Sequence, residues 1–209
     1  MIDFGSIKKT YHGQNVLDID NFSVEENKIY IVTGSNGSGK STLAKILSGL
    51  IEDDSGKLKK VYKKDGSEYK IGYLTQKPYV FDLSLESNIL ICGNDKNKCN
   101  ELIEKFGIGY LRGKNAKSFS GGETQKMGLA RFMMKDYDIV IFDESTSAMD
   151  EETKNKVAKI LKNYAFNKTM IMITHDLPHV QGIADKIIEM NGGKINDRPI
   201  KSWWFERGN

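Results

Sequence analysis

A glycine-rich run of eight residues, with a threonine directly after it, constrains the fold of this chain more than any other feature. It fits the spacing G-x-x-x-x-G-K-[ST]. An apolar, β-branched stretch over residues 29–33 precedes it and a helical pattern over residues 42–47 follows it. The run consists of Gly34, Ser35, Asn36, Gly37, Ser38, Gly39, Lys40 and Ser41, and Thr42 comes next. Strand, loop and helix in this order are the context of a phosphate-binding loop, so we predict that the chain binds a nucleoside triphosphate.

The chemistry of this loop follows from its residue types. Glycines allow the backbone to curl until its N–H groups point inward at phosphate oxygens. The N-terminus of the following helix adds partial positive charge at the same place. We expect Lys40 to place a full charge at the β- and γ-phosphates and the Ser41 hydroxyl to ligate Mg²⁺. The alternative is a glycine-rich turn that fits the motif by chance. The strand before the run and the helix after it argue against that alternative.

The composition indicates a globular protein without an obvious affinity for nucleic acid. The 209 residues include 31 basic and 28 acidic side chains, a net charge of +3 that is too balanced to indicate a nucleic-acid partner. No apolar run approaches the ~18 residues that span a bilayer, and the N-terminus lacks the features of a signal peptide. We therefore expect a cytoplasmic protein. Cys92 and Cys99 match no metal-binding spacing and are expected to be reduced thiols.

Alternation of short strands and helices predicts the fold class. Strands are expected at residues 2–7, 16–24, 29–33, 57–62, 71–74, 139–143, 170–174 and 187–190, with a turn at Asp65-Gly66. Helical patterns cover residues 42–47, 85–106, 121–135, 151–165 and 179–184. The sequence predicts an α/β P-loop NTPase core with a mostly parallel sheet, an N-terminal antiparallel β part and a small helical insertion. We expect one domain over residues 1–209, with its core at 1–76 and 136–209 and a helical lobe at about 77–135.

A second group of candidate residues lies at the end of the apolar strand at 139–143. Asp143 is the last residue of that strand and Glu144 follows it. In P-loop NTPases an aspartate in this position holds Mg²⁺, and the next carboxylate can orient or deprotonate water near the γ-phosphate. Alternation along a strand sends the two side chains in different directions, so we expect them to have different roles. The alternative is a solvated strand end with two acids.

With these motifs in place, nearly the whole chain resembles the nucleotide-binding domain of ABC transporters. Gln76 matches the Q-loop glutamine, and Tyr11 stands where the family has an aromatic that stacks on adenine; a core aromatic is the alternative for Tyr11. Further matches are the signature segment Phe119-Ser120-Gly121-Gly122-Glu123, the D-loop Ser147-Ala148-Met149-Asp150 and the switch segment Ile173-Thr174-His175-Asp176. Glu123 replaces the commoner glutamine, and Phe119 and Met149 replace leucines; we expect activity to survive all three changes.

The resemblance implies a head-to-tail homodimer with each ATP between the P-loop of one copy and the signature of the other. Ser120, Gly121 and Gly122 would form that second anion cradle, with Asp150 nearby. Glu144, His175 and Gln76 would be catalytic: the histidine donating to the γ-phosphate, the glutamine reaching Mg²⁺ and water. Ser41, Gln76 and Asp143 would be the metal ligands, and ATP and Mg²⁺ the cofactors.

The leading functional hypothesis is the ATPase subunit of a membrane transporter, peripheral on the inner face of the cell membrane and bound to a separate transmembrane subunit. The segment from Pro78 to Ser84 resembles the wall of the groove that receives the membrane partner in ABC exporters; an ordinary hydrophobic loop that anchors the helical lobe is the alternative. Within it, Tyr79-Val80-Phe81 looks more like exporters than importers, which favours export of a peptide, antibiotic or similar compound. A soluble ABC ATPase of a cofactor-assembly or other non-transport complex is the second hypothesis. A nucleotide-binding module without catalysis is the third, which Glu144 and His175 argue against.

Three further features lie outside these motifs. His12 and His179 have no motif neighbours, and we expect them to be surface or locally hydrogen-bonded histidines. The cluster Trp203-Trp204-Phe205 is expected to pack on the domain, with contact to a partner as the alternative.

Overall fold

The computed structural model describes residues 1–56 and 59–198, and it resolves into two compact units. The first unit comprises the described residues within 1–73, 137–143 and 164–198; the second comprises residues 74–136 and 144–163. Residues 144–163, expected in the core, thus pack with the helical residues. The Trp203-Trp204-Phe205 cluster lies outside the described residues.

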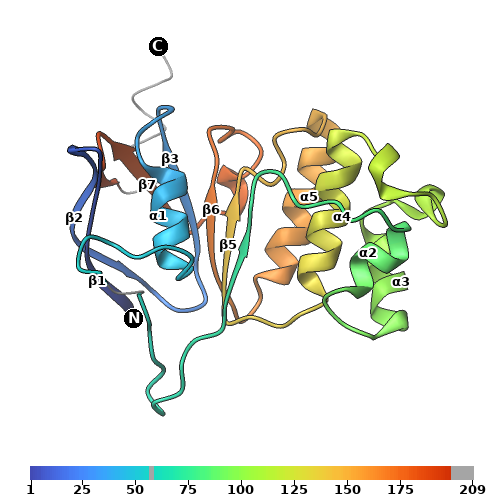
Figure 1. The fold of residues 1–209 in the computed structure, drawn as a ribbon, viewed down its shortest axis with the longest axis horizontal. Coiled ribbons are helices and arrows are strands. Elements are labelled where there is room, and N and C mark those ends of the chain that lie inside the picture. The colour runs from blue at the N-terminus through green and yellow to red at the C-terminus, as the bar shows by residue number, and fades with distance from the viewer. Residues whose placement is uncertain (57–58, 199–209) are drawn as a thin grey trace. The chain divides into compact units, whose positions relative to one another are not determined.

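Helices and strands alternate in parts of the chain only, because three strands come first and the helical residues 85–133 include no named strand (Figure 1). The strands are β1 (Ile2–Tyr11), β2 (Gln14–Val24), β3 (Ile29–Gly34), β4 (Ile71–Leu74), β5 (Ile139–Asp143), β6 (Thr169–Ile173), β7 (Lys186–Asn191) and β8 (Lys194–Arg198). The α-helices are α1 (Lys40–Leu47), α2 (Leu85–Leu90), α3 (Lys96–Lys105), α4 (Gly121–Met133) and α5 (Glu151–Tyr164). Short 3₁₀ helices cover Gly109–Leu111, Ala116–Ser118 and Gln181–Ile183.

A six-stranded sheet in the order β4-β5-β6-β3-β7-β8 forms the centre of the α/β core. β3 pairs in parallel with β6 and β7, and β5 pairs in parallel with β6, whereas β8 runs antiparallel to β7. All five residues of β5 and all five of β6 are buried, as expected for strands covered on both faces. α1 packs against β3, β5 and β6 (Figure 1). The mostly parallel sheet is confirmed.

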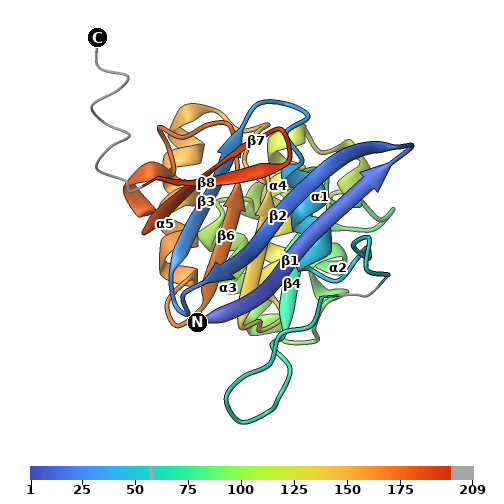
Figure 2. The same ribbon diagram turned by 90° about the vertical axis from the view of Figure 1, so that its left-hand side faces the viewer.

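A separate antiparallel pair, β1-β2, forms the N-terminal β part that the sequence predicts (Figure 2). Tyr11 pairs with Gln14, so His12 and Gly13 form a two-residue hairpin loop. Both have positive φ, 50° and 77°, as a type I′ turn requires. His12 is exposed there, as expected of a surface histidine.

The second unit is helical, and its helix starts are set by side-chain caps. Ser84 accepts from the backbone N–H of Ser87 at the start of α2, and Asp95 accepts from that of Lys98 at the start of α3. α4 contacts both α2 and α3. The predicted apolar side of α4 is confirmed, because Met127, Leu129, Ala130 and Met133 are all buried.

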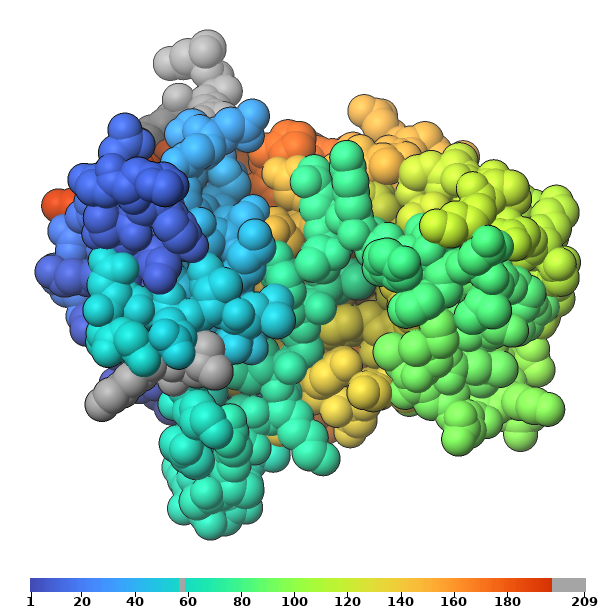
Figure 3. Space-filling model, viewed as in Figure 1, coloured from blue at the N-terminus to red at the C-terminus, as the bar shows by residue number. Residues whose placement is uncertain are grey.

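Several predicted elements differ from the structure. The strand expected at 57–62 is wrong for its described residues, which make only the isolated bridge between Tyr62 and Glu68. The turn that follows is confirmed, with the N–H of Gly66 donating to the Lys63 carbonyl at 3.0 Å, and this loop before β4 projects from the surface (Figures 2 and 3). The helix over 85–106 is two helices, α2 and α3, and the helix at 179–184 is a single 3₁₀ turn.

The strand β8 was not predicted from the sequence. Gly192 and Gly193, with φ of 53° and 79°, form a two-residue turn between β7 and β8. A Cβ on Gly193 would lie 2.5 Å from the Val16 carbonyl oxygen, and the Gly193 carbonyl accepts from the N–H of Asp18 at 2.9 Å. The Gly-Gly pair is the signal that would have identified this hairpin.

Candidate nucleotide-binding and catalytic site

The glycine-rich loop follows β3 and leads directly into α1, as the sequence predicts. Two of its glycines are required by close approach and by backbone conformation. A Cβ on Gly34, at φ 147°, would lie 2.1 Å from the Met190 carbonyl oxygen. Gly39, at φ 98°, is the N-cap of α1, and its Cβ would lie 2.7 Å from the Val16 carbonyl oxygen. Any side chain at either position would displace the loop.

Lys40 is folded into the loop that it follows. Its Nζ donates to the carbonyl oxygens of Gly34 at 2.9 Å and Ser35 at 2.8 Å, and the residue is only 7% exposed. A buried ammonium group requires such acceptors. The loop therefore holds a full positive charge among its own backbone groups, beside the N-terminus of α1, where it adds to the positive end of the helix dipole.

Ser41 and Asp143 meet at the carboxyl edge of the sheet. The Ser41 Oγ donates to Asp143 Oδ1 at 3.2 Å, although the two residues are far apart in the sequence. Asp143 ends β5 opposite Ile173 at the end of β6, so these strands finish at one edge with the glycine-rich loop. A hydroxyl and a buried carboxylate side by side are oxygen ligands of the kind that Mg²⁺ prefers, so the residues present fit a Mg²⁺ site.

The Asp143 carboxylate has a second hydroxyl partner that the sequence analysis did not identify. The Tyr73 hydroxyl donates to Asp143 Oδ2 at 3.0 Å. Burial, and next the negative charge of Asp143, raise the pKa of Tyr73, so the hydroxyl keeps its proton. Tyr73 lies three residues before the Q-loop glutamine and matches no motif, so nothing in the sequence indicated this contact.

The other predicted residues of the first unit lie at the ends of β1 and β6. Thr174 and His175 directly follow β6, and the backbone N–H of Thr174 donates to the Val32 carbonyl at 3.1 Å. His175 is exposed. Tyr11, at the end of β1, is 43% exposed, which excludes the core-aromatic alternative, and Lys9 Nζ lies 5.4 Å from its ring centre. His179 Nε2 lies 3.5 Å from Asp176 Oδ1, the local contact expected of it.

Within the second unit, Gln76 and Glu144 are paired. The Gln76 Nε2 donates to Glu144 Oε2 at 2.8 Å. Glu144 has φ 47°, a left-handed conformation that non-glycine residues rarely adopt. Such strain persists where the surrounding structure imposes it, often at functional sites. Asp143 and Glu144 thus have different hydrogen-bond partners, in agreement with the different directions predicted from strand alternation.

The signature residues form the N-terminus of α4. Ser120 and Glu123 make a capping box: the Ser120 Oγ accepts from the N–H of Glu123 at 3.3 Å, and Glu123 Oε2 accepts from the N–H of Ser120 at 2.7 Å. The Tyr110 hydroxyl donates to the other carboxylate oxygen at 2.8 Å. These bonds, the Ser120 N–H first, lower the pKa of Glu123. Glu123 is therefore an anionic helix cap.

The rest of the signature and the D-loop are also in close contact. The Cβ that a side chain would add at Gly121 or Gly122 lies 3.1 Å from an atom of Ala148, so both positions favour glycine. Asp150 accepts from the N–H and hydroxyl of Thr153, both at 2.8 Å, at the start of α5. Asp150 is thus an N-cap as well as a candidate nucleotide contact.

Gln125 is a buried polar residue of α4 that the sequence analysis missed. Its Nε2 lies 3.3 Å from the Gln76 carbonyl oxygen, 3.4 Å from that of Glu144 and 3.1 Å from Ser147 Oγ. Its Oε1 accepts from the N–H of Ala148 at 2.9 Å. One side chain therefore joins the signature helix, the Q-loop, the residue after β5 and the D-loop. The signal in the sequence that could have identified Gln125 was a polar residue within an apolar helical pattern.

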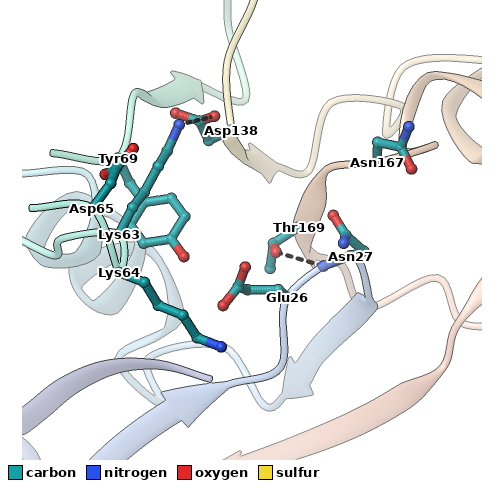
Figure 4. A pocket seen from close by; sticks show the side chains of 9 residues that line it. All are labelled: Glu26, Asn27, Lys63, Lys64, Asp65, Tyr69, Asp138, Asn167 and Thr169. Atoms are coloured by element: carbon teal, nitrogen blue, oxygen red, sulfur yellow. Dashed lines mark hydrogen bonds and ion pairs between the residues drawn. The ribbon is translucent and has the colours of Figure 1, made fainter. Parts of the chain in front are cut away.

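A cavity of about 380 Å³ lies at the edge of the sheet opposite the carboxyl ends of the parallel strands, and Figure 4 shows the side chains that line it. Asn27, Asp138 and Thr169 lie where β3, β5 and β6 begin, and the loop before β4 forms the facing wall. Its Lys63 is paired with Asp138 at 2.7 Å. The labelled lining residues are Glu26, Asn27, Lys63, Lys64, Asp65, Tyr69, Asp138, Asn167 and Thr169. None of them belongs to the predicted site.

The fold and the loop define a P-loop nucleotide-binding protein, and comparison with known proteins identifies its family. The model of the family described as ABC transporter matches residues 17–147. The tungstate uptake system ATP-binding protein TupC of Peptoclostridium acidaminophilum is 32% identical, over 94% of this chain and 97% of TupC. The chain belongs to the ABC transporter family, binds ATP and is an ABC-type ATPase.

Other relatives are longer proteins. The lactococcin-A transport/processing ATP-binding protein LcnC of Lactococcus lactis is 32% identical over 88% of this chain, which spans 28% of LcnC. The ATP-dependent lipid A-core flippase of Haemophilus influenzae is 27% identical over 94% of this chain, which spans 37% of the flippase. The described residues include no helix with the length and apolarity needed to cross a membrane.

Solved structures confirm the fold. The dimeric structure of a bacterial ABC transporter cassette aligns with a TM-score of 0.83 and 23% identity, over 96% of this chain and 99% of that one. A bacterial ABC exporter with ATP bound aligns with a TM-score of 0.84 and 21% identity, over 99% of this chain and 40% of the exporter.

Proposed function

We propose that this chain is the ATP-hydrolysing subunit of a membrane transporter and that Mg²⁺ is its metal cofactor. The observation that carries the proposal is the contact between Ser41 and Asp143 beside the buried ammonium group of Lys40. These groups offer a cation and two oxygen ligands at the end of a glycine loop, which is the set that a magnesium–triphosphate complex needs. The remaining residues of the run supply backbone N–H groups for the phosphates.

The proposed catalytic step uses Glu144 as the general base. Its carboxylate accepts from Gln76 Nε2, which restricts its orientation and leaves it an acceptor for the proton of the attacking water. In this proposal the Gln76 amide oxygen would be available to Mg²⁺, and the His175 side chain would donate a hydrogen bond to the γ-phosphate. When bound, Mg²⁺ supplies charge that neutralises the phosphate oxygens. In the proposed reaction water attacks the γ-phosphate of ATP, and the products are ADP and phosphate.

The proposed assembly is a head-to-tail homodimer in which ATP also contacts the signature of the second copy. In the capping box the Ser120 hydroxyl oxygen accepts from the N–H of Glu123. The hydroxyl proton of Ser120 can therefore be donated to a phosphate. Gly121 and Gly122 present backbone N–H groups at the start of α4, a helix of thirteen residues. Asp150, beside them in the D-loop, completes the proposed contact.

The proposed partner is a separate transmembrane subunit that covers exposed aromatic residues of the second unit, which would place the chain on the inner face of the membrane. Tyr79 and Phe81 are 68% and 38% exposed, and their rings make an edge contact with centres 4.7 Å apart. Arg131 fixes this segment by donating to the Tyr79 carbonyl at 2.7 Å. A rigid, exposed aromatic pair is suited to a protein contact. The name of TupC, the ATP-binding protein of an uptake system, supports a partner on another chain.

Export of a peptide, antibiotic or similar compound is the proposed direction and substrate class. The names of LcnC and of the flippase support it, whereas that of TupC makes uptake the competing hypothesis. The test is to purify the chain with its membrane partner and to measure ATP-driven movement of substrate in vesicles of known orientation. Co-purification with a polytopic membrane protein supports a transporter, and co-purification with a soluble scaffold contradicts it.

Tyr11 is expected to stack on the adenine ring. The variant Tyr11→Ala should bind both ATP and GTP more weakly, by about 1 kcal/mol. The two losses should be equal because stacking involves the face of the base and not its edges. Isothermal calorimetry measures both affinities, and Tyr62→Ala, at an exposed tyrosine of the loop before β4, is the control. An unchanged dissociation constant in Tyr11→Ala would remove Tyr11 from the site.

A further inference from the structure

Two hydroxyl groups contact the Asp143 carboxylate among the described residues. The Ser41 hydroxyl belongs to the phosphate-binding loop, whereas the Tyr73 hydroxyl belongs to no nucleotide-binding motif. Tyr73 donates to Oδ2 at 3.0 Å while Ser41 donates to Oδ1 at 3.2 Å. Each oxygen of this carboxylate therefore has one hydroxyl donor. The two donors come from different elements: Tyr73 lies in β4, the strand next to β5 in the sheet, and Ser41 lies in the first turn of α1.

The position of Tyr73 is fixed by the sheet. β4 is the neighbour of β5 in the sheet order, and the partly buried Tyr73 ring packs against the hydrophobic core. Asp143, the last residue of β5, is 5% exposed. The terminal torsion of an aspartate is broad, so one hydrogen bond alone leaves the carboxylate plane poorly defined. A second donor on the other oxygen defines that plane.

We propose that Tyr73 is a positioning residue that holds the Asp143 carboxylate so that Oδ1 faces Ser41 and can share a Mg²⁺ ion with it. The inference rests on the proposed Mg²⁺ site. Groups that hydrogen-bond to metal-ligating carboxylates orient them, and their removal typically costs 10–100-fold in metal affinity. Tyr73 itself contacts neither nucleotide nor metal in this account.

The variant Tyr73→Phe separates this role from simple packing, because it removes one oxygen atom and keeps the ring. We expect its affinity for a non-hydrolysable ATP analogue in EDTA to match that of the wild-type chain. In saturating Mg²⁺ the wild-type affinity should rise, and the Mg²⁺ concentration that produces half of this rise should be roughly tenfold higher in Tyr73→Phe. Calorimetry with the analogue, at a series of Mg²⁺ concentrations, measures both quantities without hydrolysis.

Tyr69→Phe is the matched control, since Tyr69 is a partly buried tyrosine that also precedes the Q-loop but lines the cavity at the opposite edge of the sheet. It should change neither the affinity in EDTA nor the Mg²⁺ dependence. A wild-type Mg²⁺ dependence in Tyr73→Phe would overturn the positioning role while leaving the proposed function standing. So would an equal loss of affinity with and without Mg²⁺, which a packing defect would cause. An absence of Mg²⁺ dependence in the wild-type chain would overturn the metal site and this inference together.

Discussion

The variant Glu144→Gln is expected to bind ATP and to hydrolyse it 10²–10⁴ times more slowly than the wild-type chain, the range typical of general-base assistance. Glutamine has the shape of glutamate but lacks the charge that accepts a proton from water. Asp143 and Ser41, which form the proposed metal site, keep their contact of 3.2 Å because neither is altered. Phosphate release at saturating MgATP measures the rate, and calorimetry measures the retained affinity.

Glu151→Gln is the control for this variant. It makes the same change at an exposed glutamate in the first turn of α5. Its hydrolysis rate should equal that of the wild-type chain. If Glu144→Gln also hydrolysed ATP at the wild-type rate, the catalytic role of Glu144 would be wrong.

The variant Lys40→Ala is expected to lose measurable ATP binding. Lys40 supplies the full positive charge of the phosphate loop, and its Nζ also joins the Gly34 and Ser35 carbonyl oxygens. Alanine leaves the phosphates with less compensating charge and leaves these carbonyls without that donor. Calorimetry with ATP provides the measurement.

Lys45→Ala serves as the control for charge, because Lys45 lies on the same helix and is exposed. It should bind ATP as the wild-type chain does. Wild-type affinity in Lys40→Ala would refute the assignment of the phosphate loop. A melting curve for each variant shows whether the loss of binding reflects the site or the fold.

The central sheet could be predicted from the sequence because its strands are short apolar runs with strong boundaries. β5 and β6 were each predicted to within one residue at either end, since strands buried on both faces read as continuous apolar segments. For residues 59–62 the expected strand was wrong, because lysines mixed with apolar residues also occur in loops. β8 was missed because its residues are mostly polar, and its turn, Gly192-Gly193, was the stronger signal.

The candidate site was predictable as a list of residues but not as a set of contacts. Motif spacing identified Lys40, Ser41 and Asp143, because each has a fixed place relative to the glycine loop or a strand end. The hydroxyl of Tyr73 and the amide of Gln125 were not identified, since their roles depend on which strands and loops become neighbours. The role of Glu123 as a helix cap was likewise visible only in the structure.

The proposed head-to-tail assembly predicts that Glu144→Gln, which hydrolyses ATP slowly, dimerises when ATP is bound. If each ATP contacts Lys40 of one copy and Ser120 of the other, ATP that is not hydrolysed should join two chains. Ser120→Arg places bulk and positive charge in the second cradle and should prevent that association without altering the glycine loop. The double variant Glu144→Gln, Ser120→Arg should therefore still bind ATP but remain a monomer.

Light scattering of Glu144→Gln with and without MgATP tests whether two chains share each nucleotide. We expect a shift from monomer to dimer on addition of MgATP, with two nucleotides bound per dimer and no shift in the double variant with Ser120→Arg. A Glu144→Gln chain that binds MgATP and remains monomeric at high protein concentration would contradict the shared site.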